Sequence, residues 1–151
     1  MKVQYFKSRN SLFLIGCLAL NNVLAQGAAE IISDLQFLDQ NFQDCVLENA
    51  SDNGWDTVDE MTNLDCYDSN IASASGIEQL IALTDLTLWR NNLEEIDLSA
   101  NTDLVYLDLD ENNLTSVNLD TNSKLENLFI SDNLLTSIDI SNNSNIYQLE
   151  L

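Results

Sequence analysis

The stretch LVYLDLDENNLTSVNLDTNSK, residues 104–124, has the same length and pattern as the blocks on either side of it. The block LTDLTLWRNNLEEIDLSANTD precedes it at 83–103, LENLFISDNLLTSIDISNNSN follows it at 125–145, and IYQLEL begins a fourth copy at 146–151. A pattern that recurs every 21 residues without interruption is typical of a solenoid, in which each block forms one coil and the coils stack.

Six positions of the block are apolar in all three complete copies. Positions 4 and 6 alternate with residues that point the other way, which is the period-2 pattern of a strand with one buried face. Because one coil cannot bury its own leucines, we expect neighbouring coils to bury them and their strands to lie side by side in a parallel sheet. In the block at 104–124 the six positions, numbered 1, 4, 6, 11, 14 and 16, are Leu104, Leu107, Leu109, Leu114, Val117 and Leu119.

Asparagine recurs twice in every complete block, at places where the coil has to turn. A buried Asn amide can donate to and accept from backbone groups that a turn leaves unpaired, and stacking repeats this arrangement from coil to coil. The two columns are Asn91, Asn112 and Asn133, and Asn101, Asn122 and Asn143.

The shared pattern, LxxLxLxxNxLxxIDLxxNxx, resembles the bacterial leucine-rich repeat in its 21-residue nested form. The resemblance covers 83–151 closely, as three full repeats and one partial repeat, and 61–82 loosely, as a degenerate first repeat. It implies an α/β-repeat fold, a leucine-rich-repeat solenoid with a parallel sheet on its concave face and a helical N-terminal cap. The pattern is specific for the fold and weakly specific for function, since such a fold is a platform for many functions.

The degenerate first repeat keeps only part of the pattern. Met61, Leu64, Cys66 and Ile71 fall on positions 1, 4, 6 and 11, and the GIEQL segment, Gly76–Leu80, resembles the back of an internalin-type repeat. An atypical terminal repeat is expected where a solenoid meets its cap.

Residues 26–60 carry no repeat, and parts of them resemble the helical cap of internalin-like proteins. Asp39 is a suitable N-cap for a helix over about 40–50, and the turn residues 52–54 would end it. Glu60 follows Thr57 by three residues, as in a capping box, so we expect one more helical turn over 57–60.

The first 25 residues are expected to form an export signal. Lys2, Lys7 and Arg9 precede a short apolar run, LFLIGCLAL at 12–20, which is too short to span a bilayer, and a small-residue cleavage pattern ends at Ala25. An alternative is a bacterial lipobox ending at Cys17, which would make that cysteine a lipid-carrying N-terminus. We favour simple cleavage and a secreted, periplasmic or cell-surface location.

Removal of this segment would leave two cysteines, Cys45 and Cys66. Two cysteines in an exported chain suggest one disulfide, and the alternative is a pair of buried free thiols. A bond between them would tie the cap helix to the first strand and stabilise the fold by roughly 3 kcal/mol.

The acidic balance of the chain excludes several classes of partner. The formal net charge is −20, and without the first 25 residues Arg90 and Lys124 stand against 25 acidic residues, a net charge of −23. Such a chain repels phosphate, which argues against nucleic acid and anionic membranes. There is no histidine, so the commonest general base and metal ligand is missing.

The concave face is the first candidate for a binding site. Positions 3, 5 and 7 of each strand point away from the core, and the spacing of strands predicts one contiguous aromatic patch of Trp89, Tyr106 and Phe129 flanked by acids. A basic protein or a glycan would suit such a surface. The alternative is a solvated sheet face whose aromatics merely favour strand conformation. The candidate residues are Tyr67, Asp85, Trp89, Tyr106, Asp108, Asp110 and Phe129.

Other carboxylate arrangements give no catalytic or metal-site prediction. Residues 49–60 have Gly and Glu at EF-hand positions, but Asn49 stands where Asp is needed and Asp56 where an apolar residue belongs. Asp108 and Asp110 share one strand of an open sheet, where no pocket is expected to shift their pKa. We therefore predict no catalytic residue, metal or cofactor.

The function predicted from these features is an exported, non-enzymatic binding module for protein recognition or cell-surface attachment. The alternative is that residues 26–151 are the N-terminal scaffold or targeting part of a longer exported adhesin or enzyme. The fourth block stops at Leu151, which fits such a fragment. It also fits a complete chain whose uncapped edge pairs with another copy or another protein.

Overall fold

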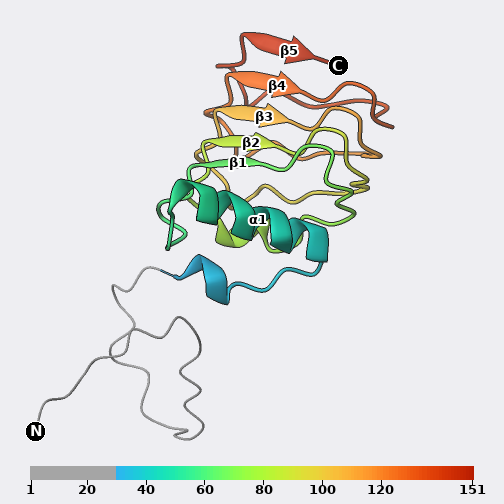
Figure 1. The fold of residues 1–151 in the computed structure, drawn as a ribbon. Coiled ribbons are helices and arrows are strands. Elements are labelled where there is room, and N and C mark those ends of the chain that lie inside the picture. The colour runs from blue at the N-terminus through green and yellow to red at the C-terminus, as the bar shows by residue number, and fades with distance from the viewer. Residues whose placement is uncertain (1–29) are drawn as a thin grey trace, which may run out of the picture.

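The computed structural model describes residues 30–151, so the expected export signal, with Cys17, lies outside the described residues. Five short parallel strands stack in chain order along one side of a solenoid (Figure 1). They are β1 (Asn63–Asp65), β2 (Asp85–Thr87), β3 (Tyr106–Asp108), β4 (Asn127–Phe129) and β5 (Gln148–Glu150). The predicted solenoid with a parallel sheet is confirmed.

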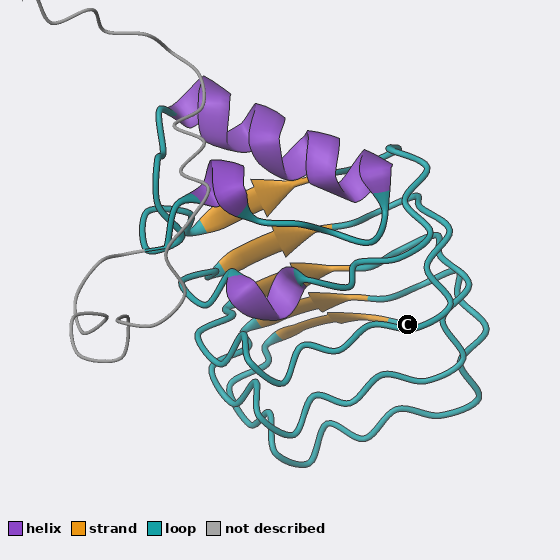
Figure 2. Cartoon of the chain, turned by 90° about the horizontal axis from the view of Figure 1, so that it is seen from below, coloured by secondary structure: helices purple, strands orange, loops and turns teal. Residues whose placement is uncertain are grey.

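The register of the sheet follows from the repeat. Each strand pairs with the next at equivalent positions, so the central leucines form one row: Leu64, Leu86, Leu107, Leu128 and Leu149. The first four are fully buried and Leu149 in β5 is 38% exposed. One face of every strand therefore joins a single core, while the other coil segments run as loops opposite the sheet (Figure 2).

The apolar columns form this core as predicted in the first two complete repeats, apart from position 14, and from residue 131 onward the apolar column residues are half-buried or exposed. Positions 1, 4, 6, 11 and 16 are buried in the repeats at 83–103 and 104–124. Position 14 is only half-buried, at Ile96, Val117 and Ile138. In the degenerate repeat Met61, Leu64, Cys66 and Ile71 are all buried, and the GIEQL segment forms the short 3-10 helix η2 (Ile77–Gln79).

The first asparagine column fills the turn after each strand, as predicted. The Asn112 amide donates to the carbonyls of Leu88, Leu109 and Asp110 at 2.9–3.1 Å and accepts from the Leu93 N–H at 3.1 Å. Leu88 and Leu93 belong to the preceding coil. One side chain therefore satisfies buried backbone groups of two coils at once.

The second asparagine column lies on the far side of the coil, and its side chains also donate to carbonyls of the preceding coil. Asn122 donates to the carbonyls of Leu98 and Asn101 at 3.1 and 2.9 Å, and Asn143 donates to those of Leu119 and Asn122 at 3.0 and 2.9 Å. The backbone carbonyl of each asparagine thus accepts from the side chain of the next.

The cap helix α1 (Gln40–Asn53) begins at the predicted residue and ends three residues beyond its predicted end at residue 50. The Asp39 carboxylate accepts from the backbone N–H groups of Asn41 and Phe42, and Gly54 ends the helix in the left-handed conformation with φ +73°. The stop is set by Gly54 because a left-handed residue is what closes the last turn. A short 3-10 helix, η1 (Ile32–Asp34), precedes α1.

Residues 57–60 form a turn rather than the expected helical turn. The Glu60 carboxylate accepts from the backbone N–H groups of Asp56 and Thr57 at 2.8 and 3.1 Å, and the Glu60 N–H donates to the Thr57 carbonyl. The capping-box contact is present without a helix behind it, because the chain enters β1 only three residues later.

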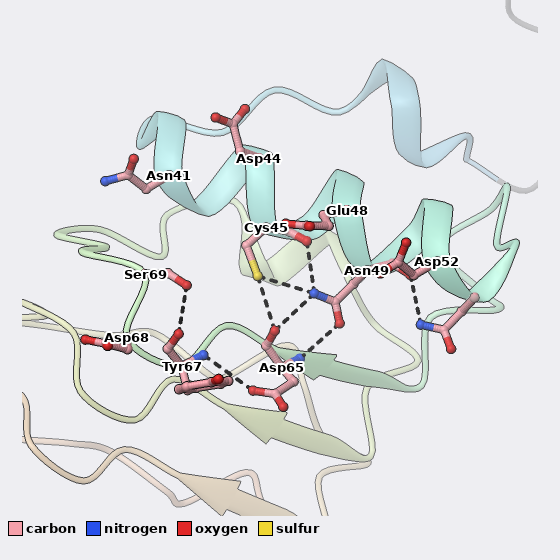
Figure 3. Close-up of a pocket in the computed structure, with 11 residues that line it drawn as sticks. Asn41, Asp44, Cys45, Glu48, Asn49, Asp52, Asp65, Tyr67, Asp68 and Ser69 are labelled. Atoms are coloured by element: carbon pink, nitrogen blue, oxygen red, sulfur yellow. Dashed lines mark hydrogen bonds between the residues drawn. The ribbon is translucent and has the colours of Figure 1, made fainter.

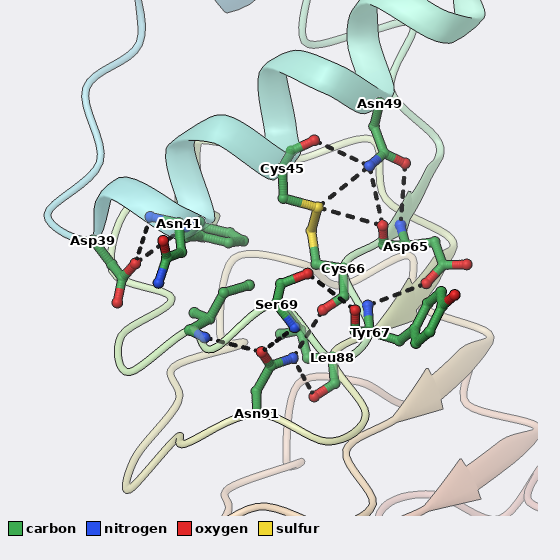
Figure 4. The surroundings of a disulfide bond; sticks show 12 residues. Asp39, Asn41, Cys45, Asn49, Asp65, Cys66, Tyr67, Ser69, Leu88 and Asn91 are labelled. Carbon is green, nitrogen blue, oxygen red and sulfur yellow. Dashed lines mark hydrogen bonds between the residues drawn. A yellow bond between two sulfur atoms is a disulfide. The ribbon is translucent and has the colours of Figure 1, made fainter.

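The disulfide, the Asp39 carboxylate and the Asn49 amide join α1 to the first coil (Figure 4), and the Asn41 amide adds a hydrogen bond to the Asn70 carbonyl at 3.0 Å. Cys45 and Cys66 form a disulfide, which confirms the predicted pairing. The second carboxylate oxygen of Asp39 accepts from the backbone N–H groups of Ala72 and Ser73 at 2.8 and 3.2 Å. Burial raises the pKa of Asp39, but the four N–H donors together hold it below its ordinary value. One carboxylate therefore caps the helix and fixes the loop beneath it.

The third contact closes the free edge of β1. The Asn49 amide donates to the Asp65 carbonyl at 3.0 Å and accepts from the Asp65 N–H at 3.3 Å. These are the two bonds that a neighbouring strand would make at this residue. The side chain of one helical residue thus replaces a strand at the edge of the sheet (Figure 4).

Gly76 is needed where the cap meets the back of the first coil. It has φ +106°, and a Cβ added there would lie 2.5 Å from the Phe37 ring. Both the backbone conformation and the close approach of the ring require glycine.

Substitution of Asn112 by alanine is predicted to lower the free energy of unfolding by about 2–4 kcal/mol, because buried backbone groups of two coils lose their partner. Urea unfolding of the variant would measure this. Asn113→Ala is the matched control, since the Asn113 side chain is exposed and the substitution should cost less than about 0.5 kcal/mol. Equal stability of the two variants would contradict the stabilising role of the first asparagine column.

Replacing both Cys45 and Cys66 by alanine is predicted to lower the free energy of unfolding by about 3 kcal/mol, because the bond restricts the unfolded chain. The same loss should appear when the wild type is unfolded with a reductant present, and reductant should not affect the double variant. An unfolding midpoint that is unchanged by reduction of the wild type would show that the bond contributes nothing to stability.

Candidate functional site

The side chains on the concave face form three rows because every strand has the same register. Position 3 contributes Asn63, Asp85, Tyr106, Asn127 and Gln148. Position 5 contributes Asp65, Thr87, Asp108, Phe129 and Glu150. Position 7, just beyond the strands, contributes Tyr67, Trp89, Asp110 and Ser131. All of the predicted site residues thus lie on one face of the sheet.

The aromatic rings on this face form two pairs rather than one patch. Tyr67 and Trp89 stack with ring centroids 6.0 Å apart and planes at 19°, and Tyr106 and Phe129 lie 5.4 Å apart at 41°. The prediction joined Trp89 to Tyr106. These residues stand at positions 7 and 3, which places them roughly 13 Å apart along the strand direction, so Trp89 stacks on its position-7 neighbour, Tyr67.

Two carboxylates lie between the aromatic pairs. Asp108 neighbours Phe129 in the position-5 row, and its carboxylate accepts from the Asp110 N–H at 3.1 Å. The Asp110 carboxylate accepts from the Ser131 N–H in the next coil. Both carboxylates are half-buried, and each is held in place by a backbone donor.

The pKa values of these two aspartates differ from the expectation for an open sheet face. Burial raises the pKa of Asp108, and the neighbouring charges of Asp65 and Glu150 add to the rise. Burial also raises the pKa of Asp110, with contributions from Asp108 and Glu150. The expectation of no pKa shift was wrong because both carboxylates are half-buried rather than fully solvated.

Tyr106 responds to the same environment. Burial raises the pKa of its phenol, and the carboxylates of Asp108, Asp110, Asp65 and Asp85 raise it further. The centre of the concave face is therefore both partly dry and strongly negative.

Arg90 was not among the predicted site residues, although it is one of only two basic residues in 30–151. It lies at position 8, where the chain leaves the strand in the left-handed conformation, with φ +59°. Its guanidinium lies 3.6 Å from the Asp68 carboxylate and 3.9 Å from that of Glu111. Position 8 is otherwise acidic, with Asp68, Glu111 and Asp132. The single cation among these acids was the available sequence signal.

A polar groove of about 710 Å³ lies between α1 and the first coil (Figure 3). Asp44, Glu48 and Asp52 line it from the helix, and Asp65, Tyr67 and Asp68 line it from the sheet side. Sequence reasoning missed this groove because it depends on where α1 packs. The acids at every fourth residue of the helix were the only signal.

The twelve residues considered as a calcium loop do not form one. Asn49–Asn53 belong to α1 and only the remainder is loop and turn. Within residues 30–151, no three His, Cys, Asp or Glu side chains are placed to hold a metal ion. The same part of the chain holds no helix of the length and apolarity that a membrane span requires.

Comparison with known proteins shows similarity to internalins of Listeria monocytogenes. No family model matches the chain. Internalin J of Listeria monocytogenes is 38% identical over 88 residues, which is 55% of this chain and 10% of internalin J. The solved functional domain of the same protein, described as including a cysteine ladder, matches 82% of this chain with 34% identity and a TM-score of 0.71.

A second solved structure, that of internalin InlF from the same species, matches 85% of this chain with 26% identity and a TM-score of 0.67. The chain spans 28% of the solved internalin J domain and 40% of the solved InlF chain. This chain therefore has a leucine-rich-repeat fold that is similar to that of the Listeria internalins.

Proposed function

We propose that this chain is an exported, non-enzymatic binding module that recognises a protein through the concave face of its sheet. The observation that carries the proposal is the row of half-buried carboxylates, Asp108 and Asp110, between two aromatic pairs. Desolvated acids and partly exposed rings on an open face oppose folding, and a ligand that offers donors and apolar surface would use both.

A basic protein segment is the ligand that this face fits best. The described residues carry two basic and 25 acidic side chains, and both basic side chains already lie near carboxylates. Cationic side chains of a partner would be attracted over long range and would pair with Asp108 and Asp110 on contact. A glycan, stacked on Tyr106 and Phe129, is the second candidate, because aromatic rings beside carboxylates also suit sugars.

Export and cell-surface attachment belong to the proposal. The disulfide between Cys45 and Cys66 fits an oxidising compartment. The alternative role is that of the scaffold or targeting part of a longer exported adhesin or enzyme. Both roles use the same concave face.

The double substitution Trp89→Ala and Phe129→Ala tests the concave face, because it removes one ring from each aromatic pair. For a protein ligand recovered with the wild-type chain, affinity should fall by about 2 kcal/mol or more, roughly thirty-fold. Surface plasmon resonance with the immobilised chain would measure it.

The matched control is the double variant Thr121→Ala and Ser123→Ala, at exposed loop positions away from the sheet. It should bind as the wild type does. Unchanged binding of the aromatic double variant to every recovered partner would overturn the proposal and leave a solenoid whose sheet face has only a structural role.

Asp108→Asn should stabilise the unliganded chain at neutral pH. A carboxylate whose folded-state pKa is raised opposes folding above that pKa, and the opposition disappears once pH falls below the unfolded value and both states are protonated. Asparagine keeps an oxygen for the Asp110 N–H. Urea midpoints at pH 7 and pH 3 would show the gain at the higher pH only, and a gain of equal size at both would contradict the assignment.

A further inference from the structure

The stacked rings of Tyr67 and Trp89 lie where the concave face meets the groove beside α1. Tyr67 is 57% exposed and lines that groove, and the Trp89 ring stacks on it. Figure 3 shows Tyr67 on the sheet side of the groove, opposite α1. A partly exposed ring backed by a second ring presents an extended π-surface, which favours a cation.

The charged side chains that line the groove beside this ring are all carboxylates. Asp44, Glu48 and Asp52 are exposed along the helix side of the groove. Within residues 30–151 neither basic side chain forms an ion pair with the three carboxylates on the helix side of the groove. Of the acids that line the groove, only Asp68 is approached, by Arg90 at 3.6 Å. The groove is therefore complementary to lysine and arginine side chains.

The free edge of β1 does not serve as the contact. Asn49 already supplies both backbone hydrogen bonds of Asp65, so a partner cannot add a strand at this residue. A ligand in the groove has to bind through its side chains.

The spacing of the helix carboxylates indicates the form of the ligand. Residues four apart on a helix are separated by about 6 Å along its axis. In an extended chain, alternate side chains point to the same side at intervals of about 6.6 Å. Basic residues at every second position of an extended segment would therefore follow Asp44, Glu48 and Asp52 one by one.

We propose that the groove docks an extended segment of a partner protein that carries lysine or arginine at alternate positions. One cation lies over the ring of Tyr67, and the following ones face the carboxylates of α1. This inference rests on the proposed function, recognition of a protein, and adds to the concave face a second surface with a stated ligand chemistry.

The test is a calorimetric titration of the intact, disulfide-bonded chain with a synthetic peptide of alternating lysine and serine. A peptide of the same composition with its lysines contiguous is the comparison. The alternating peptide should bind at least three-fold more tightly, and its affinity should fall with added salt. Equal affinity of the two peptides would reduce the binding to net-charge attraction and would overturn the proposal.

Substitutions on both sides of the groove locate the binding. The triple variant Asp44→Asn, Glu48→Gln and Asp52→Asn should bind the alternating peptide about ten-fold more weakly, because each exposed pair contributes roughly two-fold. Tyr67→Ala should cost about three-fold and Tyr67→Phe nothing, since phenylalanine keeps the ring.

The matched control removes the same charge elsewhere. Glu94→Gln, Glu95→Gln and Glu126→Gln change three exposed glutamates outside the groove. An equal loss in this control, or no loss in the groove variant, would overturn the proposal. Phe129→Ala separates the two surfaces: it should leave the ratio between the affinities of the alternating and contiguous peptides unchanged. A protein ligand lost by Phe129→Ala and kept by the groove variant would refute the groove alone.

Discussion

Each coil of this solenoid leaves backbone N–H and C=O groups that only a neighbouring coil can satisfy. The asparagine ladders meet this requirement at the turns, and the strand pairings meet it along the sheet. Since an unpaired buried polar group costs about as much as several favourable contacts provide, the apolar columns and the asparagines have to recur together. The repeat is thus the smallest unit in which the apolar columns are buried and these backbone groups find partners.

The same requirement explains the cap. The first coil has no preceding coil, so α1 supplies substitutes: the Asn49 amide at the edge of β1 and the Asp39 carboxylate at the loop that contains Ala72 and Ser73. The disulfide holds the helix where these contacts can form. The position of α1 then creates the groove beside it, so the capping of the fold and the shape of one candidate surface have the same origin.

The sequence was sufficient for most positions that repeat, with position 14 of the block as an exception. The buried columns, the parallel sheet, the asparagine turns and the row to which each concave residue belongs all follow from periodicity. Sequence reasoning failed where the packing of one particular side chain or helix determines the geometry. The stacking of Trp89 on Tyr67 depends on how far each ring lies beyond its strand, and the raised pKa of Asp108 depends on how deeply its carboxylate is buried. The groove depends on where α1 packs, which no pattern in the helix specifies.

Because each asparagine column joins only neighbouring coils, the solenoid can change its length only by whole coils. Duplication of one whole block, such as 104–124, would renew every hydrogen bond that it interrupts and would lengthen the concave face by about 4.8 Å. An insertion of any other length would set the Asn112 and Asn122 columns out of register with the coils that they join. The recognition face can therefore grow or shrink only by whole repeats, and such changes leave the packing of the core as it is.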